Sequence, residues 1–153
     1  MKLPENLQKS FHCLIKIMTI NSAGFLDHID LNVRNLKETK EFYSKLFVEF
    51  LGWKIIYDTE DYFMVGHLPG LRIGFSEVEK GKGGLFDRNK LGLHHFAIRA
   101  GSRDEVDKIY KKLLELEAEI LDSPKAYPEY SANFYAVYYL DPNGFKMEFV
   151  SYT

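Results

Sequence analysis

The chain has 153 residues, of which 46% are hydrophobic and 27% are charged, and its formal net charge at pH 7 is −2. This length and composition are typical of one globular domain, or of two small halves that share a core. Because acidic and basic residues are interspersed and nearly balanced, the charge gives no support for a nucleic-acid or membrane-surface partner.

The first 22 residues are predicted to be an N-terminal appendage to a folded domain at 23–153. The apolar run Phe11–Met18 is interrupted by Lys16 and is too short to span a membrane. No small-residue cleavage site follows it, so we do not expect a signal peptide. Cys13 is the only cysteine, which excludes an internal disulfide framework and is compatible with a cytoplasmic location.

An internal repeat organises the rest of the chain, because residues 26–47 and 93–114 align without a gap. The identical pairs are Leu26/Leu93, His28/His95, Glu38/Glu105, Tyr43/Tyr110, Lys45/Lys112 and Leu46/Leu113. Apolar class is also conserved between the two copies at several further positions. Each copy therefore predicts the same local structure.

Each copy predicts a strand, a short turn and an amphipathic helix. Asn35 and Ser102 are N-cap residues, and a carboxylate stands three residues after each of them. Apolar residues then recur at helical spacing. Three strands are predicted after each helix, at Trp53–Asp58, Tyr62–Gly66 and Leu71–Val78 in the first copy and at Glu119–Leu121, Asn133–Leu140 and Phe145–Ser151 in the second.

Two βαβββ units in tandem, at about 24–78 and 91–152, follow from this pattern, with a Lys- and Gly-rich linker at 79–89. The closing strands 70–75 and 144–149 also align, and the extra residues of the second unit fall in the loop around Ser123–Pro128. This arrangement resembles the vicinal oxygen chelate superfamily of glyoxalases, bleomycin-resistance proteins, fosfomycin-resistance enzymes and type I extradiol dioxygenases. The resemblance implies an α+β fold whose two curved sheets combine into an open, cup-shaped barrel with the helices outside.

Strand alternation places His28, His95 and Glu148 opposite the apolar positions that should pack on the helices. Two imidazoles and one carboxylate bind a divalent metal ion and leave positions open for substrate. The resemblance implies the same three ligands, with Fe, Mn, Ni or Zn as the metal. The alternative is a hydrogen-bonded histidine at each first strand and a solvent-exposed Glu148.

The sequence also departs from the resembled families. Gly74 aligns with Glu148, at the place where glyoxalases and related epimerases generally carry a fourth ligand. The remaining set is that of non-haem iron oxygenases, and fosfomycin-modifying enzymes share it. Residues 137–148 match the closing part of the extradiol fingerprint, which would make Tyr138 a catalytic phenol, although the preceding histidine of that fingerprint is missing. For Tyr138 the alternative is simple packing in the barrel.

Three further side chains are placed by the same alternation. Arg72 and Arg99 are expected to point toward the cup, where they could bind an anionic substrate. His94 is expected to face the helix side.

The resemblance implies a cytoplasmic metal-dependent enzyme whose small-molecule substrate chelates the metal through adjacent oxygens, with lyase, isomerase or dioxygenase chemistry. The alternative is a metal-free, ligand-sequestering protein of the bleomycin-resistance type. Thiol transfer, as in some fosfomycin-resistance enzymes, stays open as well. Relatives form the cup within one chain or across a homodimer, and the linker at 79–89 permits both.

Overall fold

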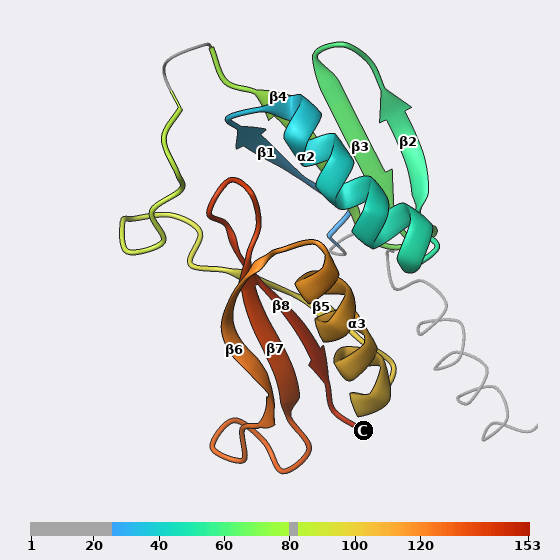
Figure 1. The fold of residues 1–153 in the computed structure, drawn as a ribbon, viewed down its shortest axis with the longest axis vertical. Helices are drawn as coiled ribbons and strands as arrows, with labels where there is room; N and C mark the ends of the chain where they lie inside the picture. The colour runs from blue at the N-terminus through green and yellow to red at the C-terminus, as the bar shows by residue number, and fades with distance from the viewer. Residues whose placement is uncertain (1–25, 80–82) are drawn as a thin grey trace, which may run out of the picture.

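Two four-stranded mixed sheets, each with helical structure against one face, make up the fold (Figure 1). The computed structural model describes residues 26–79 and 83–153. Within these ranges the predicted α+β architecture of tandem βαβββ units is confirmed, and the two sheets are open and separate. The predicted appendage at 1–22 lies outside the described residues. No helix in the described part is long and apolar enough to cross a membrane.

The first unit has the strand order β1-β4-β3-β2, and only its β1–β4 pair is parallel. Its elements are β1 (His28–Val33), α2 (Leu36–Tyr43), a π-helical continuation η1 (Ser44–Phe50), β2 (Lys54–Asp58), β3 (Tyr62–Gly66) and β4 (Arg72–Glu77). The predicted N-cap is confirmed, since the Asn35 side chain accepts a hydrogen bond of 3.1 Å from the backbone N–H of Glu38.

The second unit repeats this topology in the order β5-β8-β7-β6, again with a parallel first pair. Its elements are β5 (Phe96–Arg99), α3 (Arg103–Glu115), β6 (Glu119–Ala126), β7 (Tyr135–Leu140) and β8 (Lys146–Ser151). Ser102 caps α3 as predicted. β6 continues beyond the predicted Leu121 and through Pro124. Pro124 has no backbone N–H, and β6 tolerates this because it is an edge strand whose pairing with β7 shifts register around the proline.

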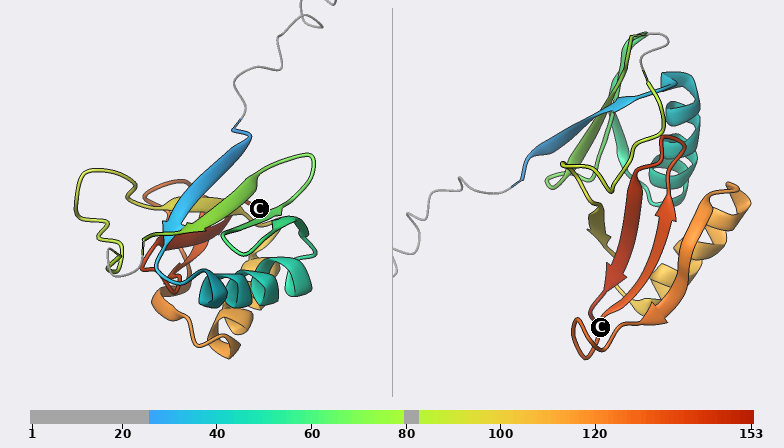
Figure 2. Two further views of the ribbon diagram at one scale, coloured as in Figure 1. Left: turned by 90° about the horizontal axis from the view of Figure 1, so that it is seen from above. Right: turned by 90° about the vertical axis from the view of Figure 1, so that its left-hand side faces the viewer.

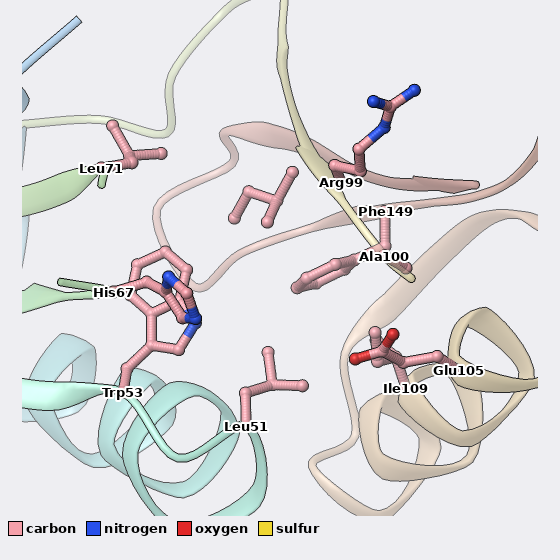
Figure 3. A pocket seen from close by; sticks show the side chains of 10 residues that line it. Leu51, Trp53, His67, Leu71, Arg99, Ala100, Glu105, Ile109 and Phe149 are labelled. Carbon is pink, nitrogen blue, oxygen red and sulfur yellow. The ribbon is translucent and has the colours of Figure 1, made fainter. Parts of the chain in front are cut away.

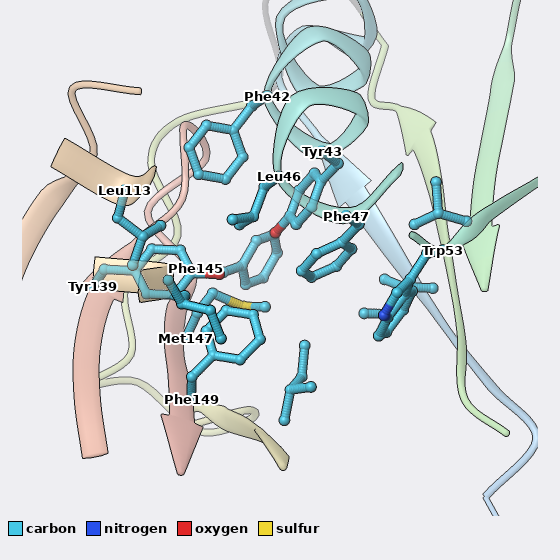
Figure 4. Packing of buried hydrophobic residues seen from close by; sticks show 14 of the residues in the cluster. Phe42, Tyr43, Leu46, Phe47, Trp53, Leu113, Tyr139, Phe145, Met147 and Phe149 are labelled. Atoms are coloured by element: carbon cyan, nitrogen blue, oxygen red, sulfur yellow. The ribbon is translucent and has the colours of Figure 1, made fainter. Parts of the chain in front are cut away.

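The helix of the first unit packs against the second unit as well as against its own sheet (Figure 4). The ring centroids of Phe42 and Tyr139 lie 6.4 Å apart, and those of Phe47 and Phe149 lie 6.2 Å apart. Phe47 and Tyr139 are completely buried. The two units therefore share one hydrophobic core, which forms along their helical sides.

A polar contact at the 141–144 turn, between β7 and β8, fixes this packing. The Tyr43 hydroxyl donates a 2.9 Å hydrogen bond to Asp141, and the Asn143 side chain donates one of 3.1 Å to the Thr39 hydroxyl. Asn143 in turn accepts a 3.0 Å bond from the backbone N–H of Arg34. The turn needs Gly144 at its end, where φ is 86°. Burial raises the pKa of the Asp141 carboxyl, so its hydrogen bonds compensate only in part for the loss of water.

Replacing Tyr43 by Phe should lower the free energy of unfolding by about 1–3 kcal/mol, because a buried carboxylate loses one of its donors. Tyr139→Phe is the matched control, since the Tyr139 hydroxyl is equally buried but has no hydrogen-bond partner among the described residues. Urea denaturation of both variants provides the measurement. Equal losses in the two would show that the Tyr43–Asp141 bond contributes nothing specific.

Candidate functional site

Both helices lie on one side of the molecule, which leaves the other face of each sheet open (Figure 2). On the second sheet this open face carries a pocket of about 420 Å³. His95, Tyr138, Lys146 and Glu148 are among its lining residues. The predicted cup-facing positions of the second unit thus do line a common hollow.

Glu148 and His95 form the polar centre of this pocket. Glu148 is 2% exposed, and its Oε2 lies 3.1 Å from His95 Nε2. Its other carboxylate oxygen, Oε1, is buried and has no hydrogen-bond partner within the described ranges. Burial raises the pKa of the Glu148 carboxyl, although the Tyr138 hydroxyl and the Lys146 charge both act to lower it. Burial also lowers the pKa of His95, which favours the neutral imidazole that a metal ion requires.

Tyr138 reaches the pocket because its strand, β7, pairs with β8 so that Tyr138 stands directly opposite Glu148. Its ring lies 6.1 Å from that of His95 in an edge-to-face arrangement. Burial, followed by the Glu148 carboxylate, raises the pKa of the Tyr138 phenol, which therefore stays protonated at neutral pH.

His94 lines the same pocket, so the prediction that it faces the helix side is wrong. Its Nδ1 lies 2.7 Å from His95 Nδ1. The prediction treats His94 as part of the strand, whereas β5 begins at Phe96. Residues before the strand need not follow its period of two.

An aromatic wall, which we define as Tyr127, Tyr130, Phe134, Tyr138 and Tyr152, closes the far side of the pocket. Tyr127 and Tyr130 are stacked at 5.7 Å, whereas Tyr138 meets Tyr127 edge-to-face at 5.5 Å. Phe134 meets Tyr152 edge-to-face at 5.3 Å. The Lys146 ammonium lies 4.4 Å from the centre of the Tyr138 ring. The sequence prediction missed this wall, whose signal was the longer loop of the second unit.

His28 lies on the first sheet, at the start of β1. Its Nδ1 is 2.8 Å from Asp27 Oδ1, its Nε2 is 3.4 Å from Asp30 Oδ2, and its side chain is 49% exposed. Asp30 accepts a 2.6 Å hydrogen bond from the Tyr62 hydroxyl. Arg72 forms an ion pair with Asp27.

A single chain therefore brings His95, Glu148 and Tyr138 together and leaves His28 on the other sheet. Across residues 26–79 and 83–153, no group of three or more His, Cys, Asp or Glu side chains could hold a metal ion. The three-residue ligand set stays a prediction, and one chain by itself does not assemble it.

A second pocket, of about 270 Å³, lies where the two units meet, on the side of Trp53 and His67 (Figure 3). Glu105 from α3 and Phe149 from β8 line its opposite wall. It contains none of the predicted metal ligands. Arg99 borders it, but the guanidinium lies 4.6 Å from the Tyr152 ring, at the aromatic wall.

Residues 25–149 match the family model of the Glyoxalase/Bleomycin resistance protein/Dioxygenase superfamily. The chain belongs to this superfamily. A comparison with curated proteins gives no match.

Solved structures of the superfamily share the fold. A protein from Bacillus halodurans assigned as a glyoxalase is 31% identical, with a TM-score of 0.71 over 84% of this chain and 96% of that one. A glyoxylase/bleomycin resistance protein/dioxygenase domain from Frankia sp. EAN1pec is 24% identical, with a TM-score of 0.68 over 85% and 98%. The fosfomycin resistance protein FosX from Listeria monocytogenes is 20% identical, with a TM-score of 0.61 over 84% and 93%. A variant of FosX was solved with Mn(II) and 1S,2S-dihydroxypropylphosphonic acid.

If Glu148 is kept for function rather than for folding, Glu148→Gln should stabilise the metal-free protein. The change removes a buried charge whose Oε1 has no partner among the described residues, and it should raise the melting temperature by roughly 2–4 °C. Thermal unfolding in the presence of a chelator tests this, with the exposed Glu119→Gln as control. A lower melting temperature for Glu148→Gln would mean that the carboxylate contributes to stability.

Proposed function

We propose that the protein is a metal-dependent enzyme of the superfamily that acts on a small substrate chelating a divalent metal ion through adjacent oxygens. The observation that carries this proposal is the buried Glu148 carboxylate, whose Oε1 has no partner in the described structure while Oε2 faces His95. A buried, unpaired carboxylate oxygen is costly, and a bound cation would satisfy it. The neutral state favoured for His95 suits the same ligand.

His28 would complete the site from a second copy of the chain. β1 and β5 both lie at sheet edges, and edge strands are the natural places for another chain to pair. A two-fold dimer that sets β1 of one copy beside β5 of the other would form two equivalent sites. Each would draw His28 from one copy and both His95 and Glu148 from the other. The Asp27 carboxylate, bonded to His28 Nδ1, would leave Nε2 free for the metal.

The metal, when bound, would act as a Lewis acid that stabilises the negative charge developing on a substrate oxygen. Tyr138 stands directly opposite Glu148 and would donate a hydrogen bond from its phenol to a substrate oxygen. The aromatic wall would hold the rest of the substrate and exclude water from one side of the pocket.

A second candidate is a metal-free protein that sequesters a ligand. The aromatic wall favours it, because aromatic rings that line a pocket of about 420 Å³ can bind planar ligands without any metal. The metal content of protein purified without chelators, with Mn, Fe, Ni and Zn each offered afterwards, separates the two functions.

The proposed site should bind about one metal ion per chain, and His28→Ala, His95→Ala and Glu148→Ala should each abolish binding because they remove ligands of one site. Co-expression of His28→Ala with Glu148→Ala under different affinity tags isolates the mixed dimer. In that dimer one site has lost both residues and the other has lost neither. It should therefore hold about half the metal of the wild type, since one of its two sites is intact.

If each site lay within one chain, both sites of the mixed dimer would lack a ligand, and metal binding would not return. Lys54→Ala, on an exposed position of β2, is the control and should bind as the wild type does. A wild type that stays empty with all four metals would exclude the enzyme proposal and leave ligand sequestration.

A further inference from the structure

Each unit places a histidine, a carboxylate and a tyrosine side by side, although the carboxylate comes from a different strand in each unit. In the second unit a histidine Nε2 faces a carboxylate oxygen at 3.1 Å, and the tyrosine that pairs with that carboxylate's strand stands beside it. In the first unit His28 Nε2 faces Asp30 Oδ2 at 3.4 Å, and Tyr62 donates a hydrogen bond of 2.6 Å to Asp30 Oδ1. The carboxylate comes from β8 in one unit and from β1 in the other.

Gly74 explains why the carboxylate of the first unit comes from β1. It pairs with Asp30 on β1 and with Met64 on β3, just as Glu148 pairs with Ala97 on β5 and with Tyr138 on β7. A Cβ atom at Gly74 would lie inside van der Waals contact with both the Asp30 carboxylate and the Tyr62 hydroxyl. The space that a side chain at this position would fill is therefore taken by the Asp30 carboxylate. The Asp30 carboxylate can occupy this space only because residue 74 has no side chain.

We propose that Asp30 replaces the carboxylate that Gly74 lacks and is the fourth protein ligand of the metal site. This inference rests on the proposed function. Each site would then contain His28 and Asp30 from one copy, and His95 and Glu148 from the other.

The spacing of the donors fits this role. Two donors that each lie about 2.1 Å from a shared metal ion are separated by about 3.0–3.4 Å. The His28–Asp30 distance of 3.4 Å and the His95–Glu148 distance of 3.1 Å both agree with that separation. If Nδ1 of His28 donates its proton to Asp27, its Nε2 lone pair faces a carboxylate lone pair, an arrangement that a cation between them stabilises.

The Asp30 carboxylate is also held in place before any metal arrives. Tyr62 occupies Oδ1 and leaves Oδ2 directed at His28. A fixed ligand loses less conformational freedom when the metal binds.

Four protein ligands narrow the reaction class. The two imidazoles and two carboxylates would together hold the metal and would leave room for two adjacent substrate oxygens. A dioxygenase would need further room for dioxygen. The Asp30 assignment therefore favours isomerase or lyase chemistry over dioxygenase chemistry.

The test is the affinity of the metal-free full-length protein for Mn²⁺, measured by titration calorimetry. Asp30→Ala should weaken binding at least tenfold, whereas Asp61→Ala, exposed in the β2–β3 loop, should leave it unchanged. Gly74→Glu alone should not strengthen binding, because its side chain collides with Asp30 and Tyr62. In the double variant Asp30→Ala/Gly74→Glu, Tyr62 has lost the Asp30 acceptor that holds it, so the end of its side chain can move aside for the new residue. This variant should bind Mn²⁺ more tightly than Asp30→Ala, since it returns a carboxylate to the site from β4. Thermal unfolding of each variant shows that it is folded.

Unchanged Mn²⁺ affinity in Asp30→Ala, with affinity lost in His28→Ala, would overturn the role of Asp30 and leave the proposed function standing. Failure of the double variant to regain affinity would show that Asp30 and Gly74 do not exchange roles. A wild type that binds no Mn²⁺ and none of the other metals would overturn the proposed function and the Asp30 assignment together.

Discussion

The buried hydrogen bond from Tyr43 to Asp141 is the contact on which the arrangement of the two units depends. It ties helix α2 of the first unit to the turn that leads into β8 of the second, and the aromatic core packs around it. Separating the two would remove one donor from the Asp141 carboxylate, which keeps only those of Asn143 and Phe145, and would expose the shared aromatic core. The units are thereby fixed along their helical sides, so both sheets keep an open face and β1 and β5 stay at free edges.

This arrangement has a direct consequence for the candidate site. The strands that carry His28 and Glu148 belong to sheets that do not close on one another in one chain. The contact of α2 with the 141–144 turn joins the two units along their helical sides. A second copy can supply the missing face without breaking that contact. The stability of the monomer and the proposed assembly of the site are thus compatible.

The sequence was sufficient for the fold because its signals are local and occur twice. The N-caps at Asn35 and Ser102 and the helical and strand periodicities are set within a few residues, and the structure has them as predicted. The face of Glu148 also followed from alternation, and Tyr138 was found by its match to the extradiol fingerprint. The aromatic wall and the position of His94 did not follow from the sequence, because an irregular loop and the residues before β5 follow no period.

The internal repeat reveals that Gly74 lacks the carboxylate of Glu148, but it does not reveal that the Asp30 carboxylate lies over this glycine. Asp30 aligns with Ala97, so the alignment presents it as an unrelated difference between the units. Only strand pairing reveals that Asp30 and Gly74 are neighbours on the same face, and only the geometry shows that the Asp30 carboxylate needs the space above the glycine. In the proposed site the carboxylate of the first unit would therefore come from β1 instead of β4. A repeat that diverges in this way would keep the donor types of its site while losing the motif that identifies them.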